Sequence, residues 1–170
     1  QYRWTVEFGS SANDIPKWVC KKVTKPQVEI TEAEHVFLNH TFYYPGRVKW
    51  GEVDLTIVDP LAFDTAERLQ DILLESGYTT PNNIPVNTPG TSLTTISKRL
   101  AVGKVGQVYI NQIDSTGVTR EQWILHNAWI KNVNFGSLDY SSEDLVEIEV
   151  KLRYDYAEQV GASTFGPALV

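Results

Sequence analysis

The chain has 170 residues, of which 42% are hydrophobic and 21% charged, as expected for a globular protein with a sizeable core. Its net charge is −6 at pH 7, which argues against a broad basic surface for nucleic acids. A single cysteine, Cys20, excludes an intrachain disulfide and a cysteine-rich zinc site, and no apolar run is long enough to predict a membrane span.

The first third of the chain alternates between apolar and polar residues, as half-buried strands do. "YRWTVEF" and "KWVCKKV" predict two strands, and the polar loop between them favours a hairpin. A longer extended segment, "PQVEITEAEHVFLNHTFYYPG", runs from Pro26 to the turn signal Pro45-Gly46. "GEVDLTIVD" alternates again and predicts the next strand.

One segment has helical rather than strand periodicity. "LAFDTAERLQDILLESG" predicts a single amphipathic helix over about residues 60–76, packed on a sheet. Asp59, which precedes a proline, is one candidate N-cap, and Asp64 with Glu67 offers a capping box one turn later. Gly77 is the expected C-terminal cap.

The helix is followed by a long loop rich in proline and threonine, "YTTPNNIPVNTPGTSLTT", over about residues 78–96. Loops of this length are uncommon in compact domains, so an interaction loop and a plain insertion both remain open. Beyond it, "VGQVYINQID" and "QWILHNAWIKNV" predict further strands, and the whole chain, residues 1–170, is expected to form one domain.

Residues 146–156 show the most regular alternation in the sequence. Eleven extended residues would form a strand of about 36 Å, about twice the usual length. A strand this long at a sheet edge invites pairing with another chain, or closure into a shared barrel. Its apolar face comprises Val146, Ile148, Val150, Leu152, Tyr154 and Tyr156, and its charged face comprises Glu147, Glu149, Lys151, Arg153 and Asp155.

Motifs for metal, nucleophilic or phosphate chemistry are not found. His35, His40 and His126 lack the spacing of a zinc site, and the first two would lie on opposite faces of one strand. Cys20 has no acid–base partner in its surroundings and is interpreted as a buried, inert thiol. "AVGKVGQV" lacks the P-loop pattern and predicts a hairpin turn. We therefore expect no metal and no cofactor.

Two carboxylate pairs are candidates for catalytic groups. Glu52 with Asp54, and Glu147 with Glu149, each share one strand face at a spacing of two residues. Acid–base catalysis on glycosides normally needs carboxylates from different elements that flank a cleft. Because these pairs lie on faces that also carry lysine and arginine, we interpret them as solvated and expect no enzymatic activity.

An ordered set of motifs resembles the tail tube proteins of contractile-tailed bacteriophages. At the C-terminal end they are "WIKNVNFGSLDY" (Trp129–Tyr140) and "EVKLRYDYAE" (Glu149–Glu158); further upstream they are "WTVEF", "WVCKKVTKP" and "WGEVDLTIV", followed by the helix. Each motif alone is weak, but together they cover about 160 residues in the family's order. The chain departs from the family's pattern in its Pro/Thr-rich loop and in its tail "VGASTFGPALV".

The resemblance implies an antiparallel β-sandwich or barrel-like subunit with one flanking α-helix. Six copies would form a ring that lends strands to a shared β-barrel, and stacked rings would form the inner tube of a virion tail, assembled in the host bacterial cytoplasm. The implied partners are other copies of the chain, the tail sheath, baseplate and tail-terminator proteins. The implied partners within the channel are the tape-measure protein and passing DNA, which the wall would not bind in a sequence-specific way. An acidic wall would repel phosphates and favour sliding.

Two sets of site residues follow as hypotheses. The candidate channel-facing residues are Glu147, Glu149, Lys151, Arg153, Asp155, Glu52 and Asp54, with the acidic turn Glu143-Asp144 as a further source of negative potential. The candidate inter-subunit or inter-ring residues are Glu29, Ile30, Glu32, Glu34, Phe37, His40, Phe42, Tyr43 and Tyr44, to which the Pro/Thr-rich loop can add.

Three alternatives to the main tube subunit stay open. A baseplate tube-initiator of the same fold would differ in copy number. A needle subunit of a type VI-like secretion system would form hexameric rings without a genome to pass. A carbohydrate-binding or hydrolytic β-sandwich, from a different class, would be a monomer or dimer with a cleft of clustered aromatic residues.

Overall fold

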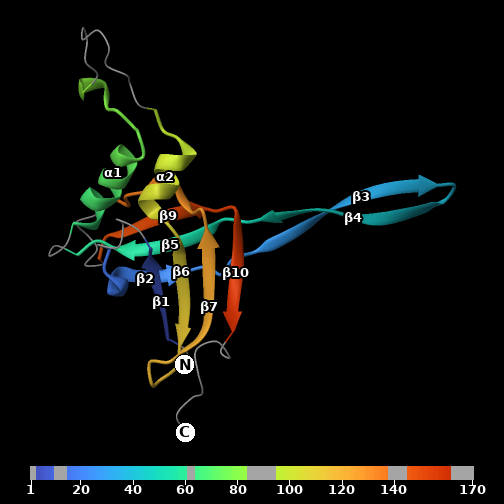
Figure 1. The fold of residues 1–170 in the computed structure, drawn as a ribbon, viewed down its shortest axis with the longest axis horizontal. Coiled ribbons are helices and arrows are strands. Elements are labelled where there is room, and N and C mark those ends of the chain that lie inside the picture. The colour runs from blue at the N-terminus through green and yellow to red at the C-terminus, as the bar shows by residue number, and fades with distance from the viewer. Residues whose placement is uncertain (1–2, 10–14, 61–63, 84–94, 138–144, 162–170) are drawn as a thin grey trace.

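The computed structural model of the chain describes residues 3–9, 15–60, 64–83, 95–137 and 145–161 (Figure 1). Short 3-10 helices occupy Lys17–Val19 and Pro81–Asn83, and the α-helices are α1 (Thr65–Glu75) and α2 (Lys98–Val105). The strands are β1 (Arg3–Phe8), β2 (Cys20–Val23), β3 (Val28–Phe37), β4 (His40–Trp50), β5 (Val53–Val58), β6 (Val108–Ile113), β7 (Thr119–His126), β8 (Trp129–Asn134), β9 (Glu147–Arg153) and β10 (Tyr156–Gly161).

The body of the molecule contains two four-stranded antiparallel sheets, with the orders β1-β6-β7-β10 and β2-β5-β9-β8. Their apolar faces form one core; in the second sheet Leu55 lies opposite Val150, and Ile57 opposite Ile148, all buried. The alternation in the sequence therefore does place one side of β5 and one side of β9 inside. The predicted mainly β, antiparallel sandwich is confirmed.

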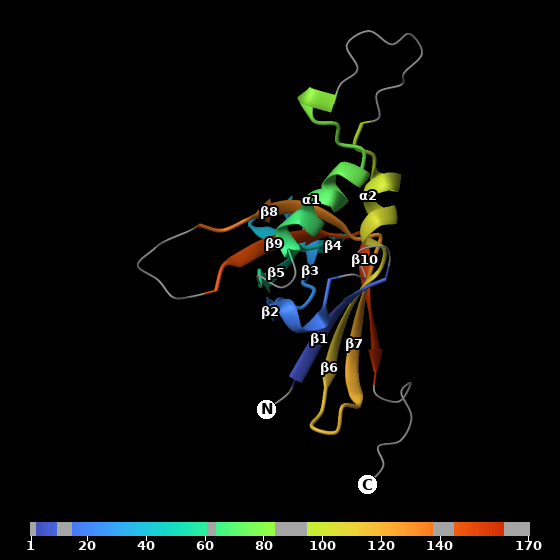
Figure 2. The same ribbon diagram turned by 90° about the vertical axis from the view of Figure 1, so that its left-hand side faces the viewer.

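Two helices, rather than the single one predicted, pack together beside this body, and α2 also contacts β8 (Figure 2). Helix α1 begins at the later of the two candidate positions, because the Asp64 carboxylate accepts a hydrogen bond from the Glu67 N–H at 2.8 Å. Asp59 contributes as well, since its Oδ1 accepts from the Thr65 N–H at 3.0 Å. After α1 the chain turns at Gly77, whose φ of 106° suits glycine.

Two predictions about local structure were wrong. The segment "AVGKVGQV" contains most of α2 and ends it at Gly106, with a φ of 72°; it is not a hairpin turn. The first two strands do not pair with each other either. β1 pairs with β6 and β2 with β5, so the two neighbouring segments join different sheets.

The predicted eleven-residue strand is also wrong, because the chain crosses from one sheet to the other at residues 154–155. β9 belongs to the second sheet and β10 to the first. At this corner the alternation shifts by one residue: Tyr154 is buried, but Tyr156 is exposed and Ala157 is buried instead. The segment "QWILHNAWIKNV" changes sheets in the same way, at Asn127, with a φ of 55°. Strands that switch sheets form the corners of such sandwiches.

Some sequence-based predictions concern residues outside the described ranges. These are most of the Pro/Thr-rich loop (84–94), the "LDY" turn with the acidic Glu143-Asp144 (138–144) and the C-terminal tail (162–170). None of the helices in the described part of the chain is long and apolar enough to cross a membrane.

Candidate assembly surface

Strands β3 and β4 form a two-stranded hairpin that extends away from the body (Figure 1). We call residues 28–50 the arm. Neither of its strands has a buried residue, and the tip residue Leu38 is 84% exposed, with a φ of 53°. Nine of the seventeen exposed large hydrophobic side chains in the described ranges lie on the arm: Val28, Ile30, Val36, Phe37, Leu38, Phe42, Tyr43, Tyr44 and Val48.

The pairing register divides the outer part of the arm into two faces. Glu34 pairs with Tyr43 and Val36 with Thr41, so these residues share one face with Glu32. We call it the acidic face. Residues one position along lie on the opposite, aromatic face, which comprises Ala33, His35, Phe37, His40, Phe42 and Tyr44. Within it the rings of His40 and Phe42 meet edge to face, with centroids 4.6 Å apart.

The turn predicted at Pro45-Gly46 is instead an irregularity inside β4. The register shifts there, and the Thr31 hydroxyl oxygen accepts a hydrogen bond from the Arg47 N–H at 2.8 Å. A Cβ at Gly46 would lie 2.5 Å from Thr31 Oγ1, so this close approach needs glycine. The chain reverses earlier, at Leu38-Asn39, and this places His35 and His40 on the same face of the arm.

All nine candidate inter-subunit residues lie on the arm, divided between its two faces. The nine do not include Val28, Val36, Leu38 and Val48, which are also more than half exposed, although Val36 and Leu38 lie within the same extended segment, Glu29–Tyr44. The hairpin that carries these residues could have been recognised from the sequence, because the two residues Leu38-Asn39 separate two alternating runs. A monomer leaves this apolar surface in water, and patches of this kind mark sites of protein–protein contact.

The candidate channel residues cover the outer side of β9 and the start of β5. Lys151 lies opposite Asp54, with Nζ and Oδ1 3.4 Å apart, and Lys21 forms an ion pair with Glu147. Glu149 lies in the same row, opposite Thr56. This face therefore carries charges of both signs, several of them paired across strands, and the structure does not concentrate negative potential there.

Glu52 shows the same balance at the edge of this face. Its carboxylate pairs with Lys131 and lies 3.8 Å from an Arg153 nitrogen. The hydrogen bond from Lys131 lowers the pKa of Glu52, as do the nearby charges of Lys131, Arg153 and Lys151. These pairs are exposed, so they set the local potential more than they stabilise the fold.

Asp155 does not belong to this face. It lies at the corner between β9 and β10, where its carboxylate accepts hydrogen bonds from Lys98 Nζ at 2.6 and 2.8 Å and from Asn127 Nδ2 at 2.8 Å. Its own N–H donates to the His126 carbonyl. These bonds, that from Lys98 first, lower the pKa of Asp155. Asp155 joins the start of α2 to both sheet-crossing segments, which is a structural role.

Among the described residues, other reactive groups do not gather into a site. Burial raises the pKa of the Cys20 thiol to about 11, so it is protonated at neutral pH. His126 stacks on Tyr156 with centroids 4.4 Å apart, and its Nε2 lies 3.0 Å from a Glu158 carboxylate oxygen. Across the described residues, no three histidine, cysteine or acidic side chains group as metal ligands would.

No family model and no curated protein sequence matches the chain. Solved structures do share its fold. A chain of the sheath/tube terminator of an extracellular contractile injection system (PVC) aligns with a TM-score of 0.65 and 17% identity, over 94% of both chains. A chain of the PVC sheath–tube complex aligns with a TM-score of 0.63 and 18% identity, over 94% of this chain and 88% of that one. A chain of the anti-feeding prophage baseplate aligns with a TM-score of 0.61 and 14% identity, over 95% of this chain and 93% of that one.

At these identities the likeness establishes the fold. The expected resemblance in architecture is confirmed: nearly the whole chain has the fold found in components of contractile, tail-like assemblies.

Proposed function

We propose that this chain is a structural subunit of the tube of a contractile, tail-like assembly, in which six copies form a ring and rings stack around a channel. The observation that carries the proposal is the shared fold over 94% of both chains with a component of a sheath/tube terminator. The arm supports the proposal, because a surface with this many exposed apolar side chains is typical of a site that binds another chain. No catalytic role is part of the proposal.

The arm is proposed as the main contact between subunits or rings. Its two strands bury no side chain in the monomer, so the hydrophobic gain from nine large side chains is available only on assembly. Burying one such side chain fully contributes about 1.5–3 kcal/mol. The nine arm residues expected from sequence, from Glu29 to Tyr44, stay in this proposal.

The outer face of β5 and β9 is proposed as the channel wall, with Glu147, Glu149, Lys151, Glu52 and Asp54 as lining residues. Arg153, the last residue of β9, stands at the edge of this wall, where it also lines a pocket at the base of the arm. Asp155 is not in this proposed wall, because it is bound at the corner. A wall of paired charges would neither hold nor strongly repel a passing polyanion. Sharing the sheet between subunits would also pair the exposed edges of β2 and β8.

The cargo and the position in the tube are finer parts of the proposal. In a phage virion the channel would hold the tape-measure protein and pass DNA, with the sheath, baseplate and terminator proteins as neighbours. A tube of an injection device is the second candidate, because the matched structures include extracellular contractile injection systems. A baseplate chain shares the fold too, so a tube-initiator is also a candidate, and copy number per particle separates it from the main subunit.

The test is electron microscopy of the purified chain at increasing concentration, beside a variant in which residues 31–47 are replaced by Asn-Gly. The two-residue loop suits a hairpin and keeps the base of the arm. We expect rings or hollow tubes from the wild type and none from the variant, with the same thermal unfolding of the body. A wild-type protein that remains monomeric at high concentration contradicts the proposal.

A further inference from the structure

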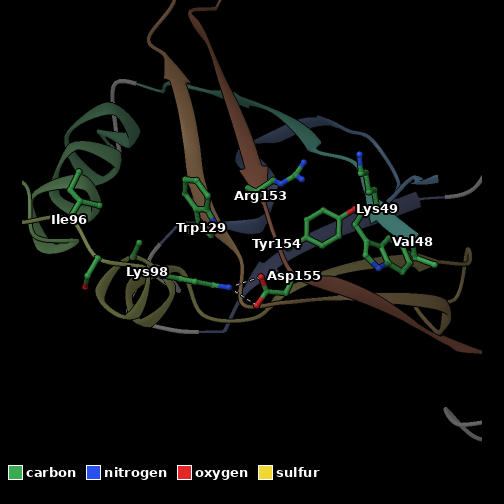
Figure 3. Close-up of a pocket in the computed structure, with 11 residues that line it drawn as sticks. Val48, Lys49, Ile96, Lys98, Trp129, Arg153, Tyr154 and Asp155 are labelled. Atoms are coloured by element: carbon green, nitrogen blue, oxygen red, sulfur yellow. Dashed lines mark hydrogen bonds and ion pairs between the residues drawn. The ribbon is translucent and has the colours of Figure 1, made fainter. Parts of the chain in front are cut away.

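A cavity of about 590 Å³ lies at the base of the arm, where β4 returns to the body, β8 begins, β9 ends and α2 starts (Figure 3). It is lined by apolar and cationic side chains, among them Lys49, Trp50, Ile96, Lys98, Trp129 and Arg153. We call it the base cavity.

The base cavity has more positive than negative charge. Lys98 is directed at Asp155 and is neutralised by it (Figure 3). Arg153 extends toward Lys49 and has only a 3.8 Å contact with Glu52, which Lys131 already pairs. Lys49 makes no ion pair with any described residue. The cavity therefore suits an occupant that brings carboxylates together with apolar side chains.

The acidic face of the arm has this chemistry. Glu32 and Glu34 point to the same side as Val36 and Tyr43, which are 65% and 61% exposed. Neither glutamate forms an ion pair within the part of the chain that the structure describes. Carboxylates beside unburied apolar groups are complementary to cations beside tryptophans.

We infer that the acidic face of one copy's arm docks into the base cavity of a neighbouring copy, with Glu32 and Glu34 against Lys49 and Arg153. This inference rests on the proposed assembly and names the surface that receives the arm. Because donor and receptor are different patches of the same chain, the contact is heterologous and generates rings or filaments rather than closed two-fold dimers.

The arm of the same copy cannot fill the cavity. In the β3–β4 register Lys49 lies opposite Glu29, at the arm's base, and Glu34 lies five residues further out on β3. At ~3.3 Å per residue, the two positions are about 17 Å apart along a straight hairpin. Contact between Glu34 and Lys49 therefore requires two molecules.

Cross-linking distinguishes this docking from other uses of the arm. In a Cys20→Ala background, Glu34→Cys protein is mixed with Lys49→Cys protein under assembly conditions and oxidised. We expect a disulfide-linked dimer that contains one copy of each variant. His35→Cys mixed with Lys49→Cys is the matched control, because His35 is adjacent in sequence but lies on the aromatic face. Efficient cross-linking through His35→Cys, with little through Glu34→Cys, overturns the inference.

Charge exchange provides the second readout. Glu32→Lys with Glu34→Lys should raise the concentration needed for tubes about tenfold or more, whereas Glu67→Lys, at an exposed position of α1, should not. Adding Lys49→Glu and Arg153→Glu to the arm variant should restore assembly.

If the wild type forms tubes and the arm reversal has no effect, or is not rescued, the inference fails while the proposed function stands; another occupant, such as an acidic segment of a sheath protein, then fills the cavity. If the wild type forms no ring or tube, both fail.

Discussion

The arm and the β5–β9 sheet have similar sequence patterns but opposite environments. In β5 and β9 every second side chain is apolar and buried, as in Leu55 opposite Val150. In the arm, apolar residues such as Ile30 and Val36 recur at even spacing, yet they are more than half exposed. The sheet is packed by other elements of the chain, whereas these arm side chains are left exposed in the described part of the chain. Alternation therefore marks a surface that can be covered but not what covers it.

The largest effect is expected in the body. Leu55→Ala removes a fully buried side chain from between the sheets and should lower the free energy of unfolding by about 2–5 kcal/mol. Denaturant unfolding of the monomer measures this. A loss below about 1 kcal/mol would mean that the core is not where the two sheets meet.

The matching substitution in the arm should leave the body intact and weaken assembly. Phe37→Ser, at a 61% exposed position, should change the free energy of unfolding by less than about 0.5 kcal/mol. The same variant should need a higher concentration to form rings or tubes, as seen by light scattering. A large loss of monomer stability would show that the arm packs on its own body.

Glycine positions in the arm and in α2 should respond differently to an added methyl group. Gly46→Ala brings a Cβ within 2.5 Å of Thr31 Oγ1, so the irregularity in β4 must distort, and assembly should fall without loss of body stability. Gly103→Ala, in α2, is the matched control, since its Cβ meets nothing within 4 Å; it should raise stability by up to about 1 kcal/mol. Equal effects of both variants on assembly would contradict a special role for the arm.

The sheet-crossing corner should contribute less. Asp155→Ala removes the bonds from Lys98 and Asn127 and should lower the free energy of unfolding by about 1 kcal/mol, since the pair with Lys98 is largely exposed. Lys98→Ala keeps the hydrogen bond from Asn127 to Asp155 and should lower the free energy of unfolding by less. If Asp155→Ala leaves stability unchanged but alters assembly, Asp155 belongs to a contact surface after all.

The smallest effect concerns pH and the β6–β7 hairpin of the body. Hydrogen bonds to Asp114, from the Thr116 hydroxyl first, lower the pKa of this carboxyl from 3.8 to about 2. Because the folded pKa is depressed, its stabilising contribution is present above about pH 4 and is lost as the pH falls toward 2. The protection factor of the Val118 amide, which is its exchange rate relative to that of an unfolded chain at the same pH, should fall over that range, because its N–H donates to Asp114. Asp114→Asn should remove this dependence, and an unchanged pH profile would contradict the assignment.

Much of the secondary structure could be predicted because strands and helices have local periodicities. The helix after Asp64 followed from apolar spacing and a capping carboxylate, and β5 from strict alternation. Helix α2 was missed because "KRLAVGKV" is short, carries an internal glycine and has no clear apolar stripe. The cavity at the arm's base was not predictable, since it joins β4, α2, β8 and β9 from distant parts of the chain.

The sequence by itself determined which side chains of a strand such as β5 share one face, because a period of two is a property of the extended backbone. Only the tertiary structure decided where the strand that begins at Glu147 ends. The amino-acid sequence goes on alternating between apolar and charged residues past Tyr154, but there the chain turns a corner and enters the other sheet. The tertiary structure also showed that β3 and β4 leave the body as an arm, because whether an apolar face is covered depends on the elements packed against it.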